Sequence, residues 1–85
     1  MCEIAVVPTN DDDDQITAVT HLCKQLYDGN PHGLGIVAVY TNDDTFRYRT
    51  LKTGFGAEPD WDEDVVPFLE NNTNAWRLVC HARYA

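Results

Sequence analysis

The run Leu34-Gly35-Ile36-Val37-Ala38-Val39-Tyr40 is apolar on both of its alternating sides. A strand with one solvated face alternates apolar with polar residues, so this pattern predicts a central strand that is buried on both faces. Residues 41–44 follow as a polar turn, and Thr45–Leu51 then alternates aromatic with basic side chains. This alternation predicts a half-exposed strand that forms a hairpin with the central one.

The segment before the central strand predicts one strand and one helix. The β-rich run Cys2–Val7 is stopped by Pro8, which indicates a short strand. Apolar residues then recur at helical spacing over Gln15–Tyr27, and aspartates at 11–14 are placed to cap this helix. Asp28-Gly29-Asn30-Pro31 ends it.

The segment after the hairpin predicts a second helix and a last strand. Asp60–Glu63 resembles a capping box, but a helix starting there would hold Pro67 in its interior. We therefore expect the helix to begin between Asp62 and Asp64 and to end by residue 72. Ala75–Tyr84 alternates as a strand, with Trp76, Leu78, Cys80, Ala82 and Tyr84 on one side and Arg77, Val79, His81 and Arg83 on the other.

These elements predict a single domain over residues 1–85 of the α/β (α+β) class, in the order β-α-β-β-α-β. That order is typical of a ferredoxin-like sandwich, and it is equally compatible with the start of a larger α/β sandwich. The pattern alone does not separate the two folds.

The charge balance excludes two classes of partner. Fourteen acidic residues face six basic ones, for a net charge of −8, whereas nucleic acid and anionic membranes require a basic surface. The acidic excess resembles that of proteins from salt-adapted organisms. The N-terminus has no basic and apolar leader pattern and no apolar run could span a membrane, so we expect a cytoplasmic protein with free thiols.

Cys2 is the sharpest chemical feature. Removal of Met1 would leave one residue that carries both a thiol and a free α-amine. The amine titrates near the thiol and can act as its base, so a single residue supplies nucleophile and base.

His81 and Arg83 form a second candidate site, because residues two apart on a strand project from one face. A guanidinium fork suits a carboxylate, and a neighbouring histidine adds a donor. The glycine-spaced turn 31–35 permits close backbone approach or positive φ before the central strand. We expect no metal site, because Cys80 and His81 face opposite sides of a strand and the sequence has no Cys-x-x-Cys pair.

Three segments together resemble class II glutamine amidotransferases, in the order that this family has them. Met1-Cys2-Glu3 resembles the family start, in which the nucleophilic cysteine follows the initiator methionine. Asn30–Tyr40 resembles the segment with a Gly-Trp-Gly-Ile-like strand start, with Leu34 where tryptophan is frequent. Residues 80–85 resemble the His-x-Arg-Tyr/Trp-Ala strand.

The resemblance implies a fold and roles for particular residues. The fold would be part of the four-layered αββα sandwich of N-terminal-nucleophile hydrolases. Cys2 would attack the side-chain amide of glutamine, the substrate, and no cofactor is expected. Arg83 would hold the substrate's α-carboxylate, Tyr84 would line or cover the pocket, and His81 would support its wall.

Family members also have an Asn-Gly segment that forms the oxyanion hole and a later aspartate that binds the substrate amine, and these 85 residues contain neither. Losing one oxyanion donor costs about 10²–10³ in rate, so we expect the chain alone to be a poor catalyst that a complementary chain would complete. The alternative is a non-catalytic, acidic α/β module that binds a protein partner or associates with itself.

Overall fold

The computed structural model describes residues 3–8, 13–54 and 57–84. Its elements along the chain are β1 (Glu3–Pro8), α1 (Asp13–Gly29), β2 (Leu34–Asn42), β3 (Thr45–Lys52), a π-helical turn η1 (Trp61–Val65), α2 (Val66–Glu70) and β4 (Arg77–Ala82). The α+β class is confirmed. The strand that was predicted to start at Cys2 is described only from Glu3 onward, and the predicted caps Asp11 and Asp12 lie outside the described residues.

The four strands form one antiparallel sheet in the order β1-β4-β2-β3. The last strand of the chain thus lies between the first two. A ferredoxin-like sandwich has its first and third strands at the centre of the sheet, whereas here β4 and β2 are central and β3 is an edge. The chain does not have the ferredoxin-like strand order.

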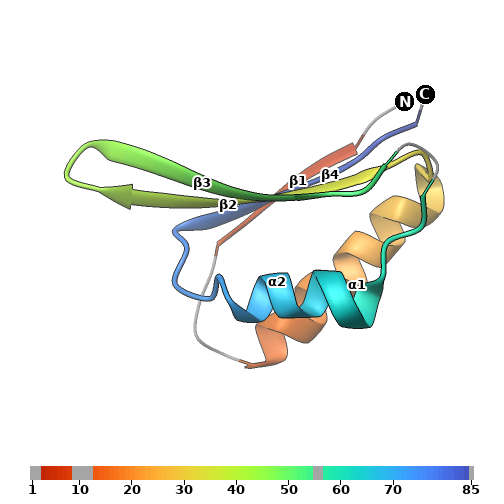
Figure 1. The fold of residues 1–85 in the computed structure, drawn as a ribbon, viewed down its shortest axis with the longest axis horizontal. Coiled ribbons are helices and arrows are strands. Elements are labelled where there is room, and N and C mark those ends of the chain that lie inside the picture. The colour runs from red at the N-terminus through yellow and green to blue at the C-terminus, as the bar shows by residue number, and fades with distance from the viewer. Residues whose placement is uncertain (1–2, 9–12, 55–56, 85) are drawn as a thin grey trace.

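Both helices lie on the same side of the sheet, so the described residues form two layers (Figure 1). We call the side of the sheet that faces the helices the inner face, and the opposite side the open face. The core lies between the layers, and its buried members are Val19, Cys23, Leu26, Leu34, Ile36, Ala38, Val65, Leu69, Ala75, Leu78, Cys80 and Ala82.

The prediction that the central strand is buried on both faces is wrong. Leu34, Ile36 and Ala38 of β2 are buried on the inner face, but the alternate residues Val37 and Val39 are only half-buried. No described element covers the open face, so the apolar side chains there have no second layer to pack against (Figure 1).

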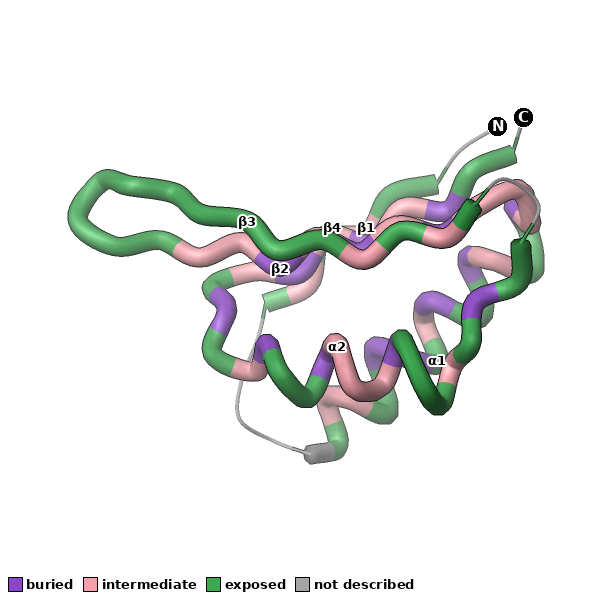
Figure 2. Tube along the Cα trace, viewed as in Figure 1, coloured by how far each residue is buried: buried purple, intermediate pink, exposed green. Residues whose placement is uncertain are grey.

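The predicted hairpin between β2 and β3 is confirmed, but the prediction that β3 is half-exposed is wrong, because it is exposed at every position except Leu51. Asn42 pairs with Thr45, and the two residues between them, Asp43 and Asp44, have φ angles of 46° and 67°. Positive φ at both central residues is the geometry of a type I′ turn, whose twist matches that of the strands. The tip of the hairpin extends beyond the helical layer and is exposed (Figure 2).

The second helical segment begins earlier than predicted. Asp60 is its N-cap, and its carboxylate accepts a hydrogen bond of 3.0 Å from the backbone N–H of Glu63. The first five residues form a wide π-helical turn, so Pro67 falls in the first turn of the regular helix α2, where its missing N–H costs little. The predicted start between Asp62 and Asp64 is therefore wrong.

The last strand keeps the alternation that the sequence predicts, over a shorter range. Leu78, Cys80 and Ala82 are buried on the inner face. Trp76 and Tyr84, which were assigned to the same side, lie outside β4 and are 47% and 49% exposed. The alternation of buried and half-buried residues therefore holds only within β4.

Candidate functional site

Cys2, the predicted nucleophile, lies outside the described residues. Its neighbour in sequence, Glu3, begins β1 and pairs with Ala82 of β4. Ala82 directly precedes Arg83 in the chain. The described end of β1 therefore lies beside the end of β4 that leads to Arg83.

His81 lies on the open face of the sheet, where it pairs with Ile4 of β1 on one side and with Gly35 of β2 on the other. It is half-buried. Cys80, the preceding residue, is fully buried on the inner face. The prediction that these two side chains face opposite sides is confirmed.

Backbone hydrogen bonds hold the residue after β4 against the turn that precedes β2. The N–H of His32 donates to the carbonyl oxygen of Arg83 at 2.8 Å, and the N–H of Arg83 donates to the carbonyl oxygen of Gly33 at 2.8 Å. Gly33 has a φ of 157°, and a Cβ built on it would lie 3.9 Å from the Cβ of Arg83. The turn therefore uses glycine where the backbone conformation disfavours a side chain, as the sequence predicted.

Asn30, at the end of α1, ties this turn to the first strand. Its side chain is 3% exposed, and its Nδ2 donates to Oε1 of Glu3 at 2.9 Å and to the carbonyl oxygen of Leu26 at 3.2 Å. A buried amide nitrogen that donates to two segments fixes them relative to each other. The sequence indicated Asn30 as part of the helix end and of the segment that carries the resemblance, but not its bond to Glu3.

A cavity of about 220 Å³ opens at this end of the sheet. Its lining consists of His32, Gly33, Leu34, Gly35, Lys52, Thr53, His81 and Arg83. Two of the three predicted binding residues, His81 and Arg83, thus line one cavity with the glycine-spaced turn.

The cavity lining carries two strong bases, Lys52 and Arg83, and no carboxylate. The protein has a net charge of −8, but the charged side chains of this lining are positive, which favours an anionic ligand. Thr53 holds the wall, because its hydroxyl accepts a hydrogen bond of 2.9 Å from the N–H of Leu34. Sequence reasoning missed Lys52 and Thr53, since only the pairing of β2 with β3 brings them to this cavity.

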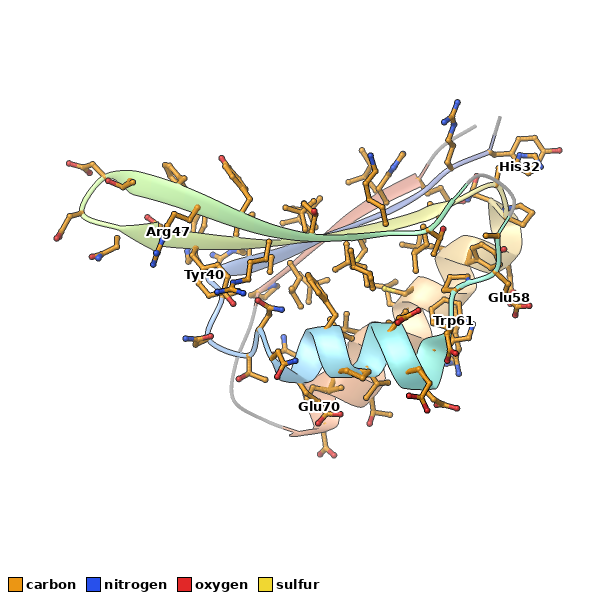
Figure 3. All side chains as sticks on the ribbon, viewed as in Figure 1. His32, Tyr40, Arg47, Glu58, Trp61 and Glu70 are labelled. Atoms are coloured by element: carbon orange, nitrogen blue, oxygen red, sulfur yellow. The ribbon has the colours of Figure 1, made fainter. Side chains whose placement is uncertain are left out.

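Tyr84 lies at the rim of the cavity rather than in its lining. Its ring centroid is 4.9 Å from that of His32, with 40° between the ring planes. His32 itself projects at the end of the sheet opposite the hairpin tip (Figure 3). The stacked pair forms a partly exposed aromatic edge beside Arg83.

The two described cysteines are in contact inside the core. Cys23 of α1 donates a hydrogen bond to the sulfur of Cys80 of β4, with 3.5 Å between the two sulfur atoms, and both side chains are fully buried. The hydrogen bond to Cys80 and the burial raise the pKa of the Cys23 thiol. A protonated, enclosed thiol is a poor nucleophile, so this pair has a structural role.

Over residues 3–8, 13–54 and 57–84, no three side chains of the types that bind metals gather into a group that could hold an ion. No helix in the same ranges is long and apolar enough to cross a membrane.

Neither the comparison with protein-family models nor the comparison with curated proteins finds a match for this chain.

Proposed function

We propose that this chain is the N-terminal part of a glutamine-hydrolysing domain of the class II glutamine amidotransferase type, with Cys2 as its nucleophile. The observation that supports it most is the cavity at the end of β4, which joins His81, Arg83 and the turn before β2. A positively charged cavity of this size suits the carboxylate end of an amino acid.

In this proposal the chemistry uses one residue as nucleophile and base. After removal of Met1, the α-amine of Cys2 takes the thiol proton and the sulfur attacks the amide carbon of the glutamine side chain. The carbon–nitrogen bond breaks, ammonia leaves with the proton, and a γ-glutamyl thioester remains. Water then attacks the thioester, the carbon–sulfur bond breaks, and glutamate and the thiol are released.

The other proposed residues bind the substrate. Arg83 holds the α-carboxylate in a bidentate pair, and Lys52 adds positive charge from the opposite wall of the cavity. Tyr84, stacked on His32, covers the entrance, and His81 forms the floor on the open face. The pairing of Glu3 with Ala82 supports a short path from Cys2 to this cavity.

The decisive experiment is labelling by a glutamine-like diazoketone, in the presence of a C-terminal piece that carries the Asn-Gly segment. We expect mass spectrometry to find Met1 removed and one label on Cys2. Cys2→Ser abolishes the label, whereas Cys23→Ala, which removes a buried thiol, leaves it. A retained Met1, or a label that persists in Cys2→Ser, refutes the proposal.

Arg83→Gln tests the binding role on the chain itself. A charge-assisted hydrogen bond contributes about 1.5–3 kcal/mol, so we expect glutamate to bind about 10–100-fold more weakly by NMR titration. Arg77→Gln is the matched control, because it removes the same charge from β4 at the far end of the strand, where Arg77 stacks on Trp76. Equal weakening in both variants contradicts a specific carboxylate site.

A second candidate function, a non-catalytic module that binds another protein, is favoured by the open face of the sheet. On this face Ile4 and Val6 of β1 are 67% and 63% exposed, and Tyr48 of β3, the other edge strand, is 64% exposed. Exposed apolar patches of this kind mark interaction surfaces. Under this reading sedimentation velocity finds a dimer or a complex that Val6→Glu disrupts, and Cys2→Ser has no effect on it.

A further inference from the structure

We call the cavity lined by His81 and Arg83 the glutamine cavity. The opposite end of the sheet carries a second cavity, of about 510 Å³. It lies where the β2–β3 hairpin extends past the helical layer, and its lining consists of Tyr40, Arg47, Tyr48, Arg49, Asn71 and Asn74. Tyr40 and Arg47 lie side by side beneath the hairpin, far from His32 (Figure 3). Gly35, in the first cavity, and Tyr40, in the second, are separated by about 17 Å along β2.

The two arginines of this cavity project from the inner face of β3. Arg47 pairs with Tyr40 and Arg49 pairs with Ala38, and Ala38 is buried in the core. Leu51, the next residue on this face, packs against the core, whereas Arg47 and Arg49 lie toward the exposed hairpin tip. Two guanidinium groups are therefore presented two residues apart, on one side of an edge strand.

Neither guanidinium is engaged within the described part of the chain: the side chains of Arg47 and Arg49 have no ion pair or hydrogen bond there. This is unexpected in a protein with fourteen acidic residues and six basic ones. Arg77, by comparison, stacks on Trp76 and donates to its carbonyl oxygen. The Arg47 and Arg49 pair thus concentrates uncompensated positive charge on one wall of a cavity.

The opposite wall is held in place by one buried amide. Asn72 is 3% exposed, its Oδ1 accepts a hydrogen bond from the hydroxyl of Tyr40, and its Nδ2 donates to the carbonyl oxygen of Phe68 at 2.6 Å. These bonds fix the turn after α2 to β2, and this turn carries Asn71 and Asn74 into the cavity. The turn that carries these two amides is therefore fixed before a ligand arrives, which reduces the entropy lost on binding.

We infer that this cavity is a binding site for a small phosphate ester. A carboxylate is satisfied by one guanidinium, whereas a phosphate monoester carries about −1.5 to −2 charges and three acceptor oxygens, which matches two arginines with two side-chain amides. The cavity volume is within the range of about 300–1,000 Å³ that small-molecule sites have. The site is separate from the glutamine cavity and does not depend on the function proposed for it.

NMR titration of the whole chain at low salt tests this inference, with inorganic phosphate, a hexose phosphate and acetate as probes. We expect saturable shifts at residues 47–49 and 71–74 with both phosphates, and at least about tenfold weaker binding of acetate. Equal affinity for acetate and phosphate refutes selectivity for a dianionic ligand, and absence of saturable shifts refutes the binding site.

Arg47→Gln and Arg49→Gln are each expected to weaken phosphate binding by at least about tenfold. Arg77→Gln removes the same charge from the open face and is expected to leave the affinity within about twofold. If Arg77→Gln weakens binding as much as the other two, the attraction is that of net charge and the inference is wrong. Circular dichroism melts confirm that each variant is folded, and Arg47→Lys with Arg49→Lys, which keep the charges, separates loss of charge from loss of the guanidinium fork.

Discussion

The two faces of the sheet have similar side chains and opposite surroundings. Ile36, on the inner face of β2, is fully buried between the sheet and the helices, whereas Ile4, on the open face of β1, is 67% exposed. Both faces carry β-branched residues, which favour strands wherever they point: Val7 and Ile36 lie on the inner face, and Ile4, Val6, Val37, Val39 and Val79 lie on the open face. Apolar composition therefore predicts the strands of this chain but does not predict which side of them is covered.

The open face also leads to the candidate chemistry. His81 projects from it, and the cavity with Arg83 lies at its end. The inner face carries the packing, including the contact between Cys23 and Cys80. Stability and the proposed function therefore depend on opposite sides of one strand, β4.

The largest expected difference between the faces comes from deleting the same side chain on each. Ile36→Ala leaves a cavity in the core and is expected to lower the free energy of unfolding by about 2–5 kcal/mol. Ile4→Ala, the matched control, is expected to lower it by less than about 1 kcal/mol. Urea denaturation measures both, and Ile36→Val, at about 0.5–1.5 kcal/mol, replaces the alanine variant if that one does not fold. Equal losses at the two sites would mean that another layer covers the open face.

A smaller effect is expected where the inner face meets the turn after α2. Asn72→Ala leaves the hydroxyl of Tyr40 and the carbonyl oxygen of Phe68 without their partner and is expected to cost about 1–3 kcal/mol. Asn74→Ala, on the exposed part of the same turn, is expected to change the free energy of unfolding by less than about 0.5 kcal/mol. Thermal melts compare the two, and similar melting temperatures would contradict a role for Asn72 as the tie between layers.

The smallest effect is a dependence on alkaline pH that originates on the inner face. The pKa of Cys23 is raised from its ordinary value of 9.0, by the hydrogen bond to Cys80 and by burial. Above pH 9.0 the unfolded chain releases the thiol proton, whereas the folded protein keeps it. The free energy of unfolding is therefore unaffected below about pH 9 and falls as pH rises, by up to about 1.4 kcal/mol per pH unit.

The matched variant for this prediction is Cys23→Ala, which removes the thiol. We expect its free energy of unfolding to be lower at pH 8 and at pH 10, and to change less between these two pH values. Urea denaturation at the two pH values measures the slope. A slope that is identical in the variant and the unchanged chain would assign the loss to other groups.

Much of the candidate site is visible in the local sequence. Strand alternation places His81 and Arg83 on one side, and the glycines at 33 and 35 indicate a turn in which a side chain is disfavoured. The contributions of Lys52, Thr53 and Asn30 are not visible, because each reaches the site through pairing or contact with a segment distant in sequence. The Arg47 and Arg49 cavity is hidden for the same reason, since it needs the turn after α2 beneath the hairpin.

The helices, strands and hairpin of this protein follow from local sequence patterns, because helical spacing, strand alternation and turn residues act over a few neighbouring positions. The sequence predicted the hairpin through Asp43 and Asp44, the helix through Val19 and Leu26, and the strand through Leu78 and Cys80. Three features appear only in the folded chain. β4 lies between β1 and β2, both helices cover one face, and Pro67 follows a π-helical turn. Those outcomes depend on which apolar surfaces find each other in three dimensions, and burial is a property of the assembled chain rather than of any segment.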